Sequence, residues 1–382
     1  MKILFWILLS TILYCYFGYP LAICLAARLR PRKVTKRASQ PAVSIVLAVW
    51  NEEEVIEGKI RNLLDLPYPV DKMEILVGSD GSTDRTNAII KSFNDPRLIF
   101  VESRQRTGKM VTINELVQRA KNGIVIFTDA RQLFDRNAIH ELIANFADPA
   151  VGSVSGELIF GRKEGGTAQG LNLYWEYEKF IRSQESKLHS MLGATGAIYA
   201  IHRELFSPVP ANVILDDMFI PFKIIEKGYR AIFDETAIAY DEVADSPKQE
   251  HRRKARTLYG NYQIFGLFLK MFNVFESPIA IQLFSHKFLR VMVPFLAIAL
   301  LIIDGLMAQE ALYKIFLILQ VIFYGMAILG ALARQGKYGI LKLISRICYI
   351  PYVFCLLNFS AMVGFVRFVT AKQDITWQKA KE

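Results

Sequence analysis

Ile75-Leu-Val-Gly-Ser-Asp-Gly-Ser-Thr-Asp84 is the stretch around which this chain is organised. The apolar residues Ile75 to Val77 predict a buried strand, the small and acidic residues Gly78 to Thr83 predict a turn, and Asp84 to Asn94 predicts a helix. A strand that runs through a loop into a helix N-terminus is where α/β proteins bind their ligands. Asp80 lies in this loop and is the first candidate site residue.

Two further acidic sites follow along the chain. Asp129 ends the apolar run Ile124-Val-Ile-Phe-Thr128, and Asp216 and Asp217 begin a predicted helix that ends near Gly228. Acids at a helix start are also common as capping groups, so this pair has a structural interpretation beside the catalytic one. Together the three sites indicate a centre for a metal ion and a phosphorylated ligand.

The region from Val43 to Asp245 alternates between strand-like and helix-like patterns. The predicted elements are a strand at Val43–Val49, a helix capped by Asn51 and running to Leu64, a strand at Leu98–Val101, a helix at Lys109–Ala120, a strand at Ile124–Thr128 and helices at Asp135–Phe146 and Gln169–Leu188. The small residues of Gly193-Ala-Thr-Gly196-Ala197 predict either a tight turn or a close approach of the backbone to a ligand. This pattern predicts an α/β sheet domain of about 200 residues.

The composition predicts membrane helices at both ends of the chain. Of the 382 residues 52% are hydrophobic, and the mean hydropathy is +0.25. Four segments are apolar over about the 20 residues that a bilayer core requires. They are Ile3–Ala27, Val291–Ala308, Ile315–Ala333 and Ile347–Val366. A cleaved signal peptide is the alternative for the first segment, which is long for one and lacks a clear cleavage site.

The positive charges predict an orientation in the membrane. A run of Arg and Lys follows Ala27, and the loop from Arg334 to Arg346 is basic, so both are expected in the cytoplasm. Three C-terminal crossings would place the basic tail outside, unless Pro351 breaks the last segment. The net charge of +10 lies mostly beside these segments, which favours anionic lipid over nucleic acid as a partner. The four cysteines lie in apolar segments and fit neither a zinc site nor a disulfide framework.

These patterns divide the chain into five regions. We predict a membrane helix at 1–28, a cytoplasmic domain at 38–248, a basic motif with interfacial amphipathic helices at 249–287, about three membrane helices at 288–369 and a polar tail at 370–382. The Arg-rich start of the third region, at Arg252, Arg253 and Arg256, suits either lipid headgroups or a diphosphate, since guanidinium groups match phosphate oxygens.

Six motifs, in this order, resemble those of the membrane-embedded family 2 glycosyltransferases. This family includes the hyaluronan, cellulose, poly-N-acetylglucosamine and chitin-oligosaccharide synthases. The motifs are Val49-Trp50-Asn51-Glu52, Ser79-Asp80-Gly81-Ser82, Thr128-Asp129-Ala130, Gly193-Ala-Thr-Gly196-Ala197, Asp216-Asp217 and Gln249-x-x-Arg252. Each motif alone is weak, but the ordered set covers nearly the whole chain and is specific.

The resemblance implies a GT-A (Rossmann-like) fold that binds a UDP-sugar with Mg²⁺ or Mn²⁺ and transfers the sugar with inversion. It implies Asp217 as the general base, Asp129 beside the metal and diphosphate, and Asp80 at the uracil and ribose. The remaining implied donor contacts are Asn51, Glu52, Lys109, Arg131, Gln249, Arg252 and Arg253, and the implied acceptor contacts are Gly196 and Asp216. Hard oxygen ligands suit these cations, and one carboxylate serves as the base for the acceptor hydroxyl.

Two motifs depart from the family pattern. The family's Asp-x-Asp reads Asp129-Ala130-Arg131, which lacks one acid, and Gln-x-x-Arg-Trp reads Gln249-Glu-His-Arg252-Arg253, which lacks the tryptophan. The leading hypothesis is polysaccharide or oligosaccharide synthesis coupled to export across the bacterial inner membrane. The alternatives are a single sugar transfer to a lipid-linked acceptor, which the missing tryptophan favours, and a non-catalytic membrane subunit of an export assembly.

Overall fold

The computed structural model describes residues 1–161, 166–241, 247–333 and 347–370, with the backbone alone at 166–173 and 247–253. The chain forms two compact units. The first, called the membrane unit here, comprises Met1–Leu29, Arg162–Ile181 and Val243–Gln373. The second, called the sheet unit, comprises Arg30–Gly161, Arg182–Glu242 and Asp374–Glu382.

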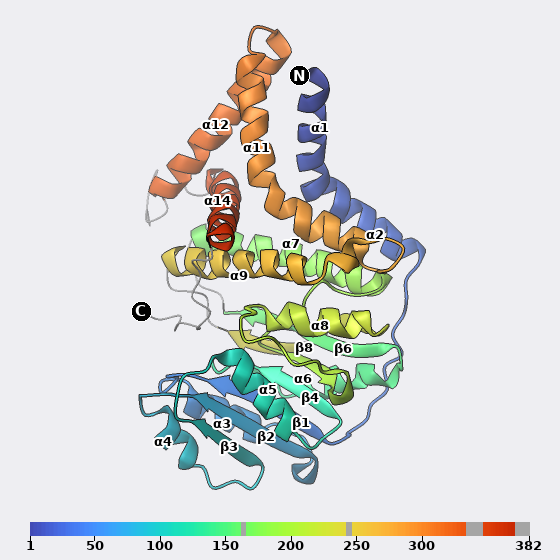
Figure 1. The fold of residues 1–382 in the computed structure, drawn as a ribbon, viewed down its shortest axis with the longest axis vertical. Coiled ribbons are helices and arrows are strands. Elements are labelled where there is room, and N and C mark those ends of the chain that lie inside the picture. The colour runs from blue at the N-terminus through green and yellow to red at the C-terminus, as the bar shows by residue number, and fades with distance from the viewer. Residues whose placement is uncertain (162–165, 242–246, 334–346, 371–382) are drawn as a thin grey trace. The chain divides into compact units, whose positions relative to one another are not determined.

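The sheet unit is built on one eight-stranded sheet of order β3-β2-β1-β4-β7-β6-β8-β5 (Figure 1). The strands are β1 (Val43–Val49), β2 (Met73–Asp80), β3 (Leu98–Ser103), β4 (Ile124–Thr128), β5 (Leu133–Phe134), β6 (Val151–Phe160), β7 (Tyr199–His202) and β8 (Arg230–Asp241). Strand β1 is parallel to both of its neighbours, and every one of its residues is buried. Its continuous apolar run is the pattern of a strand that is covered on both faces.

Helices cover both faces of this sheet. They are α3 (Ile56–Leu64), α4 (Thr86–Lys91), α5 (Lys109–Arg119), α6 (Ala138–Ala144) and α8 (Asp216–Glu226). Alternate residues of β1 pack in one core with α3, α4 and α6. Helix α5 lies on the opposite face, because a methyl group placed on Gly78 of β2 would meet Thr112 and Leu116 within 3.0 Å. The predicted α/β fold class is therefore confirmed.

The second half of the sheet differs from a simple alternation of strands and helices. Strand β7 runs antiparallel to both β4 and β6, and β5 runs antiparallel to β8. The sequence pattern located β1 to β4 but not β5 to β8. Polar and small residues interrupt β6 and β8, and β5 has only two residues, so neither periodicity nor length identifies these strands.

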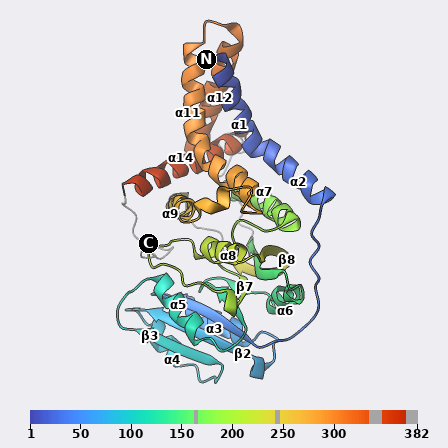
Figure 2. The same ribbon diagram turned by 45° about the vertical axis from the view of Figure 1, so that its right-hand side comes forward.

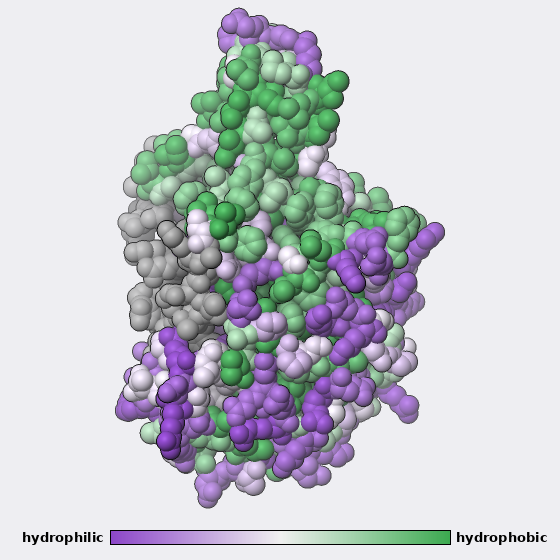
Figure 3. Space-filling view, viewed as in Figure 1, coloured by the Kyte–Doolittle hydropathy of each residue, from purple (hydrophilic) through white to green (hydrophobic). Residues whose placement is uncertain are grey.

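The membrane unit is helical. Its elements are α1 (Lys2–Leu13), α2 (Tyr19–Leu29), α9 (Pro247–Leu267), α10 (Ala280–Gln282), α11 (Leu289–Leu306), α12 (Ala311–Ala333) and α14 (Tyr349–Val369), and α7 (Gly166–Leu188) contributes to both units. Helices α1 and α11 lie side by side and share a core with α12 (Figure 2). The exposed faces of α11 and α12 are apolar (Figure 3).

Four helical spans within the described residues are long and apolar enough to cross a membrane. They are Lys2–Leu29, Ala280–Leu306, Ala311–Ala333 and Tyr349–Val369. The predicted segments are thus confirmed as helices of that length and composition, and they indicate a membrane protein. Pro351 does not break the last one, because it lies in the first turn, where proline is tolerated. The basic loop at 334–346 and the tail from 371 lie outside the described residues.

His189 gives the sheet unit a predictable response to acid. Burial, together with the charges of Arg32 and Arg230, lowers the pKa of its imidazole to about 4. In the unfolded chain this pKa is about 6.5, so the stabilisation is fully present above pH ~6.5 and is lost as pH falls towards 4. We expect a loss of about 2 kcal/mol after allowance for partial exposure.

The test compares the free energy of unfolding of wild type and His189→Gln between pH 7 and pH 4 in detergent. The variant is expected to lose less stability over this range. His140→Gln, at a histidine in a surface pocket, is the matched control. Equal pH slopes for wild type and His189→Gln would contradict the prediction.

Candidate functional site

The acidic side chains gather at the carboxyl ends of three neighbouring parallel strands. Register places Val49 of β1 beside Ser79 of β2, and Leu47 beside Thr128 of β4. Asp80, the last residue of β2, and Asp129, the residue after β4, therefore lie at the same edge of the sheet. In open α/β sheets this edge is where ligands bind.

Lys109 joins two of the acidic sites. It is the first residue of α5, and its ammonium lies 3.0 Å from Asp129 Oδ1 and 3.5 Å from Asp216 Oδ1. Asp216 is buried, and its other oxygen accepts a 3.4 Å hydrogen bond from the Tyr199 hydroxyl. Burial lowers the pKa of Lys109, but Asp129 and Asp216 outweigh this effect and the pKa is raised. The lysine is a fixed cation between two carboxylates.

Asp217 shares the site with Asp129 across Gly196. A methyl group placed on Gly196 would lie 3.5 Å from Asp217 Oδ2 and 3.8 Å from Asp129 Oδ2. The backbone of Asp217 also accepts a 2.7 Å hydrogen bond from Ala194, which ties the glycine-containing loop to the start of α8. Gly196 is thus a close neighbour of both carboxylates.

The environment of Asp217 favours its protonated form. Burial is the largest cause and the charge of Asp216 the next, and together with Asp129 they raise the pKa of Asp217 to about 7 against the opposing charges of Lys109 and Arg182. A carboxylate with a pKa near the working pH is suited to accepting and releasing a proton. Asp216 differs from its neighbour, because its carboxylate is engaged with Lys109 and Tyr199.

Asp80 holds a neighbouring loop. Its Oδ1 accepts hydrogen bonds from Thr107 N at 2.6 Å and Gly108 N at 3.0 Å, and its Oδ2 accepts one from Gly108 N at 2.9 Å. The side chain is buried, with 1% of the residue surface exposed. Gly108 has a φ of 103°, which favours glycine, and directly precedes Lys109. Asp80 therefore fixes the segment that delivers Lys109 to the site.

Asn51 and Glu52 lie in the loop after β1 and not in a helix. The prediction that Asn51 caps the next helix is wrong, because α3 begins at Ile56. Asn51 has a φ of 53°, a left-handed conformation that asparagine tolerates, and its Oδ1 accepts a 2.7 Å hydrogen bond from Thr83 N. Glu52 N donates to the hydroxyl of Thr86 at 2.8 Å. Asn51 thus joins the loops that follow β1 and β2, and Glu52 joins the first of them to the start of α4.

Arg131 is engaged with an acid from another strand. Its Nη2 lies 2.9 Å from Asp241 Oδ2 at the end of β8, and Gln132 Nε2 donates to the same oxygen at 2.7 Å. Asp241 is buried. The position at which the family pattern has a second acid is thus occupied by one half of an ion pair.

The basic motif lies on a different element. Gln249, Arg252 and Arg253 are on α9 of the membrane unit, and their side chains are outside the described residues. Their predicted contacts with the donor remain predictions.

Sequence reasoning missed roles for Trp50 and Lys59. The Arg106 guanidinium lies 3.5 Å from the centre of the Trp50 ring, and Arg106 directly precedes Thr107, which Asp80 holds. Lys59 is completely buried under the Asp129 loop. Trp50 had a signal, since an aromatic residue in a polar loop at a strand end is unusual. The sequence gives no such signal for Lys59, because a lysine at this position of a helix is usually on the surface.

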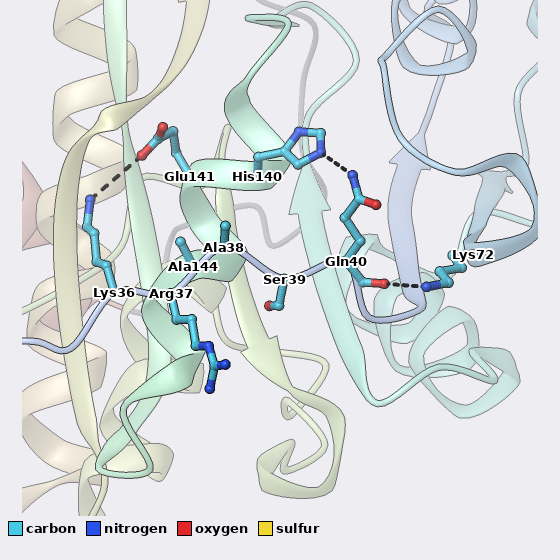
Figure 4. Close-up of a pocket in the computed structure, with 9 residues that line it drawn as sticks. All are labelled: Lys36, Arg37, Ala38, Ser39, Gln40, Lys72, His140, Glu141 and Ala144. Carbon is cyan, nitrogen blue, oxygen red and sulfur yellow. Dashed lines mark hydrogen bonds and ion pairs between the residues drawn. The ribbon is translucent and has the colours of Figure 1, made fainter.

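A surface pocket lies elsewhere in the sheet unit (Figure 4). It is lined by Lys36, Arg37, Ala38, Ser39, Gln40, Lys72, His140, Glu141 and Ala144. Gln40 lies three residues before the start of β1, and Lys72 directly precedes β2, so this pocket is at the amino ends of the strands. It contains none of the predicted site residues.

The donors present fit a metal ion that is shared with a phosphorylated ligand. The described residues contain no cluster of three or more metal-binding side chains. Asp129 offers one carboxylate, whose side chain is 40% exposed. Mg²⁺ is commonly held by one or two carboxylates plus substrate phosphates and water, so a single acid is compatible with it.

Comparison with known proteins finds similarity to one family over part of the chain. Residues 44–209 match the model of "Glycosyl transferase family 2". Poly-beta-1,6-N-acetyl-D-glucosamine synthase of Staphylococcus aureus (strain COL) is 28% identical over 239 residues, which cover 58% of this chain and 55% of the relative. The probable glycosyltransferase YdaM of Bacillus subtilis is 22% identical over 260 residues, 65% of this chain and 62% of its own length. The chain thus spans about half the length of the synthase that it matches.

A solved structure resembles nearly the whole chain. Mannosyltransferase PcManGT from Pyrobaculum calidifontis, in complex with GDP-Man and Mn²⁺, superposes with a TM-score of 0.73 at 23% identity. The match covers 97% of this chain and 100% of the neighbour. This likeness confirms the predicted GT-A fold together with the accompanying helices.

Proposed function

We propose that this chain, which is a family 2 glycosyltransferase, transfers a sugar from a nucleotide diphosphate sugar to a glycan or lipid-linked acceptor, with inversion at the sugar carbon. The observation that supports this most directly is the cluster of Asp129, Lys109 and Asp217 at the carboxyl edge of the sheet. It combines a diphosphate-binding cation, a carboxylate for a metal and a second carboxylate for a proton. A non-catalytic subunit is not supported, because the family match identifies an enzyme.

The donor that we propose is a UDP-sugar, with a GDP-sugar as the second candidate. The S. aureus relative, by its name, forms an N-acetylglucosamine polymer, whereas the structural neighbour was solved with GDP-Man. The stacked Trp50 and Arg106 offer an aromatic face and a guanidinium for a nucleobase of either kind. Asp80 helps to hold Arg106 in place, because it binds the adjacent backbone at Thr107 and Gly108.

The cofactor that we propose is Mg²⁺ or Mn²⁺, held by Asp129 and the donor's diphosphate. When bound, a divalent cation neutralises the charge that develops on the leaving diphosphate. Lys109 supplies a second, permanent positive charge beside Asp129. The second acid of the family motif is replaced by Arg131, so one metal ligand is missing. We propose that the charge of Lys109 on the diphosphate makes up part of this loss.

The proposed base is Asp217. Its carboxylate lies beside Gly196, and we propose that the acceptor hydroxyl approaches from this side. Asp217 removes the hydroxyl proton as the acceptor oxygen attacks the sugar carbon, and the nucleoside diphosphate departs from the opposite face. Asp216 keeps Lys109 in place, and its predicted contact with the acceptor stays a prediction.

Two acceptors remain to be distinguished. Polymer synthesis with export is one proposal, and it rests on the S. aureus relative. A single transfer to a lipid-linked acceptor is the other, and it rests on the end-to-end match to a mannosyltransferase and on the missing tryptophan after Arg252. In both cases we propose that the sheet unit is in the cytoplasm and the helices are in the bacterial inner membrane.

The experiment measures nucleoside diphosphate release by the purified protein in detergent with lipid extract. The panel contains UDP- and GDP-sugars, each with Mg²⁺, Mn²⁺ or chelator. Metal-dependent release with one donor would establish that donor, and sizing the product would separate polymer from single addition. No release with any donor and lipid acceptor, for a protein that remains folded, would contradict the proposal.

Asp80→Ala is expected to weaken nucleotide binding. The variant removes the acceptor of three backbone hydrogen bonds from Thr107 and Gly108, so the loop that carries Arg106 and Lys109 loosens. We expect affinity for UDP or GDP to fall about tenfold or more, given the strength of hydrogen bonds to charged groups. Calorimetry gives the affinity, and Glu102→Gln, at an exposed acid on β3, is the control. Unchanged affinity would remove Asp80 from the donor site.

A further inference from the structure

Lys59 is a buried cation for which the proposed chemistry has no use. It lies on α3 among Ile56, Ile60 and Leu63 of the core, and it is 0% exposed. A buried ammonium is costly unless its donors are satisfied, so a lysine in this position requires an explanation. An apolar residue of similar length would fill the same space without that cost.

The partners of Lys59 bracket Asp129. The ammonium donates to Thr128 Oγ1 at 2.7 Å and to the carbonyl of Gln132 at 2.5 Å, and it lies 4.5 Å from the centre of the Phe134 ring. One side chain therefore bonds both ends of the five-residue segment 128–132. Burial lowers the pKa of Lys59, and the nearby charge of Asp129 opposes this shift.

A hydrogen-bond chain continues from this segment to the other side of the site. The Thr128 hydroxyl, which accepts from Lys59, donates its own proton to the carbonyl of Ala197 at 2.9 Å. Ala197 directly follows Gly196, beside which Asp129 and Asp217 meet. Two consecutive hydrogen bonds thus connect α3 to the Asp129 segment and that segment to the glycine-containing loop.

We propose that Lys59 is a positioning residue that sets the placement of Asp129 and, through Thr128, the spacing between Asp129 and Asp217. It touches neither donor nor acceptor, and it acts from beneath the segment that would hold the metal and diphosphate. Supporting residues of this kind change metal affinity or activity by about 10- to 100-fold when they are removed. This inference rests on the proposed function, since it assigns to Asp129 the role proposed above.

The first test replaces Lys59 with methionine, which keeps the length and removes the donors. We expect affinity for Mn²⁺ in the presence of UDP or GDP to fall about tenfold or more, and kcat to fall as well. Ile60→Ala is the matched control, because it removes a fully buried side chain on α3 and leaves the two hydrogen bonds of Lys59 in place. It is expected to lower stability and to leave metal affinity unchanged.

The second test keeps Lys59 and removes the next hydrogen bond, from the Thr128 hydroxyl to the carbonyl of Ala197. Thr128→Val preserves shape but removes the hydroxyl, whereas Thr128→Ser retains it. We expect Thr128→Val to reproduce the loss of metal affinity and Thr128→Ser to restore it. In the double variant the losses should be less than additive, because both changes break one chain. This pair keeps the proposal testable if Lys59→Met fails to fold.

The outcomes separate the two proposals. If wild type binds neither Mn²⁺ nor nucleotide and releases no diphosphate, the proposed function fails. If wild type binds both, and a folded Lys59→Met or Thr128→Val binds Mn²⁺ with wild-type affinity, the positioning role of Lys59 is wrong. The proposal would also be overturned if Ile60→Ala and Lys59→Met were equally destabilised and lost equal affinity for Mn²⁺. The loss would then follow from destabilisation.

Discussion

Asp217→Asn is expected to lower kcat for sugar transfer by about 10²- to 10⁴-fold, the usual contribution of a general base. The amide keeps the size of the side chain and can still accept a hydrogen bond, but it cannot take a proton from the acceptor hydroxyl. Asp217 lies at the start of α8, half-buried and beside Gly196, so the substitution leaves the surrounding packing intact. The loss should therefore appear in turnover and not in folding.

A measurement of nucleotide affinity distinguishes the loss of the base from a general disruption of the site. Asp217 makes none of the proposed contacts with the nucleobase, so affinity for UDP or GDP should change little. Glu226→Gln, at the far end of the same helix, is the matched control and should retain wild-type turnover. Near-normal turnover by Asp217→Asn would show that another group is the base, and the buried Asp216 would be the next candidate.

Lys109→Met is expected to reduce kcat/KM by about 10²-fold or more, as for other fixed charges that stabilise a leaving group. The ammonium lies between Asp129 and Asp216, with 21% of its side chain exposed. Without it, Asp129 and Asp216 lose the cation that they share, and the diphosphate loses a positive partner. Both effects act in the same direction, which is why we expect a large loss.

Steady-state kinetics on wild type, Lys109→Met and Lys109→Arg measure this contribution. The arginine variant keeps the charge and should recover part of the activity. Lys121→Met, at an exposed lysine shortly after α5, is the control and should behave as wild type. If Lys109→Met kept its kcat/KM, the lysine would serve only to hold the start of α5 to Asp216.

Much of the first half of the sheet unit follows from local sequence. The apolar runs at Val43–Val49 and Ile124–Thr128 form strands with those bounds, because a strand covered on both faces leaves a continuous hydrophobic signature. Helix α5 follows the predicted range to within one residue. The membrane helices were equally clear, since about 20 apolar residues leave few alternatives.

The limits of local pattern appear at Asn51 and in the second half of the sheet. The local sequence around Asn51 predicts a helix cap. Its side chain instead accepts a hydrogen bond from Thr83, which is 32 positions away and so lies outside any short stretch of sequence around Asn51. The antiparallel placement of β7 between β4 and β6 depends likewise on contacts between distant segments. Pairing of this kind is decided by packing across the whole sheet.

The sequence by itself determined the class of the protein: acids at Asp80, Asp129 and Asp217 after predicted elements, and apolar segments at both ends. Composition and spacing record such features because each depends on a short stretch of chain. Only the tertiary structure decided what the acids do. Asp216 holds Lys109 and Asp80 holds a loop, while buried Lys59 lies beneath Asp129. These roles depend on distances between segments far apart in sequence, which folding alone brings together.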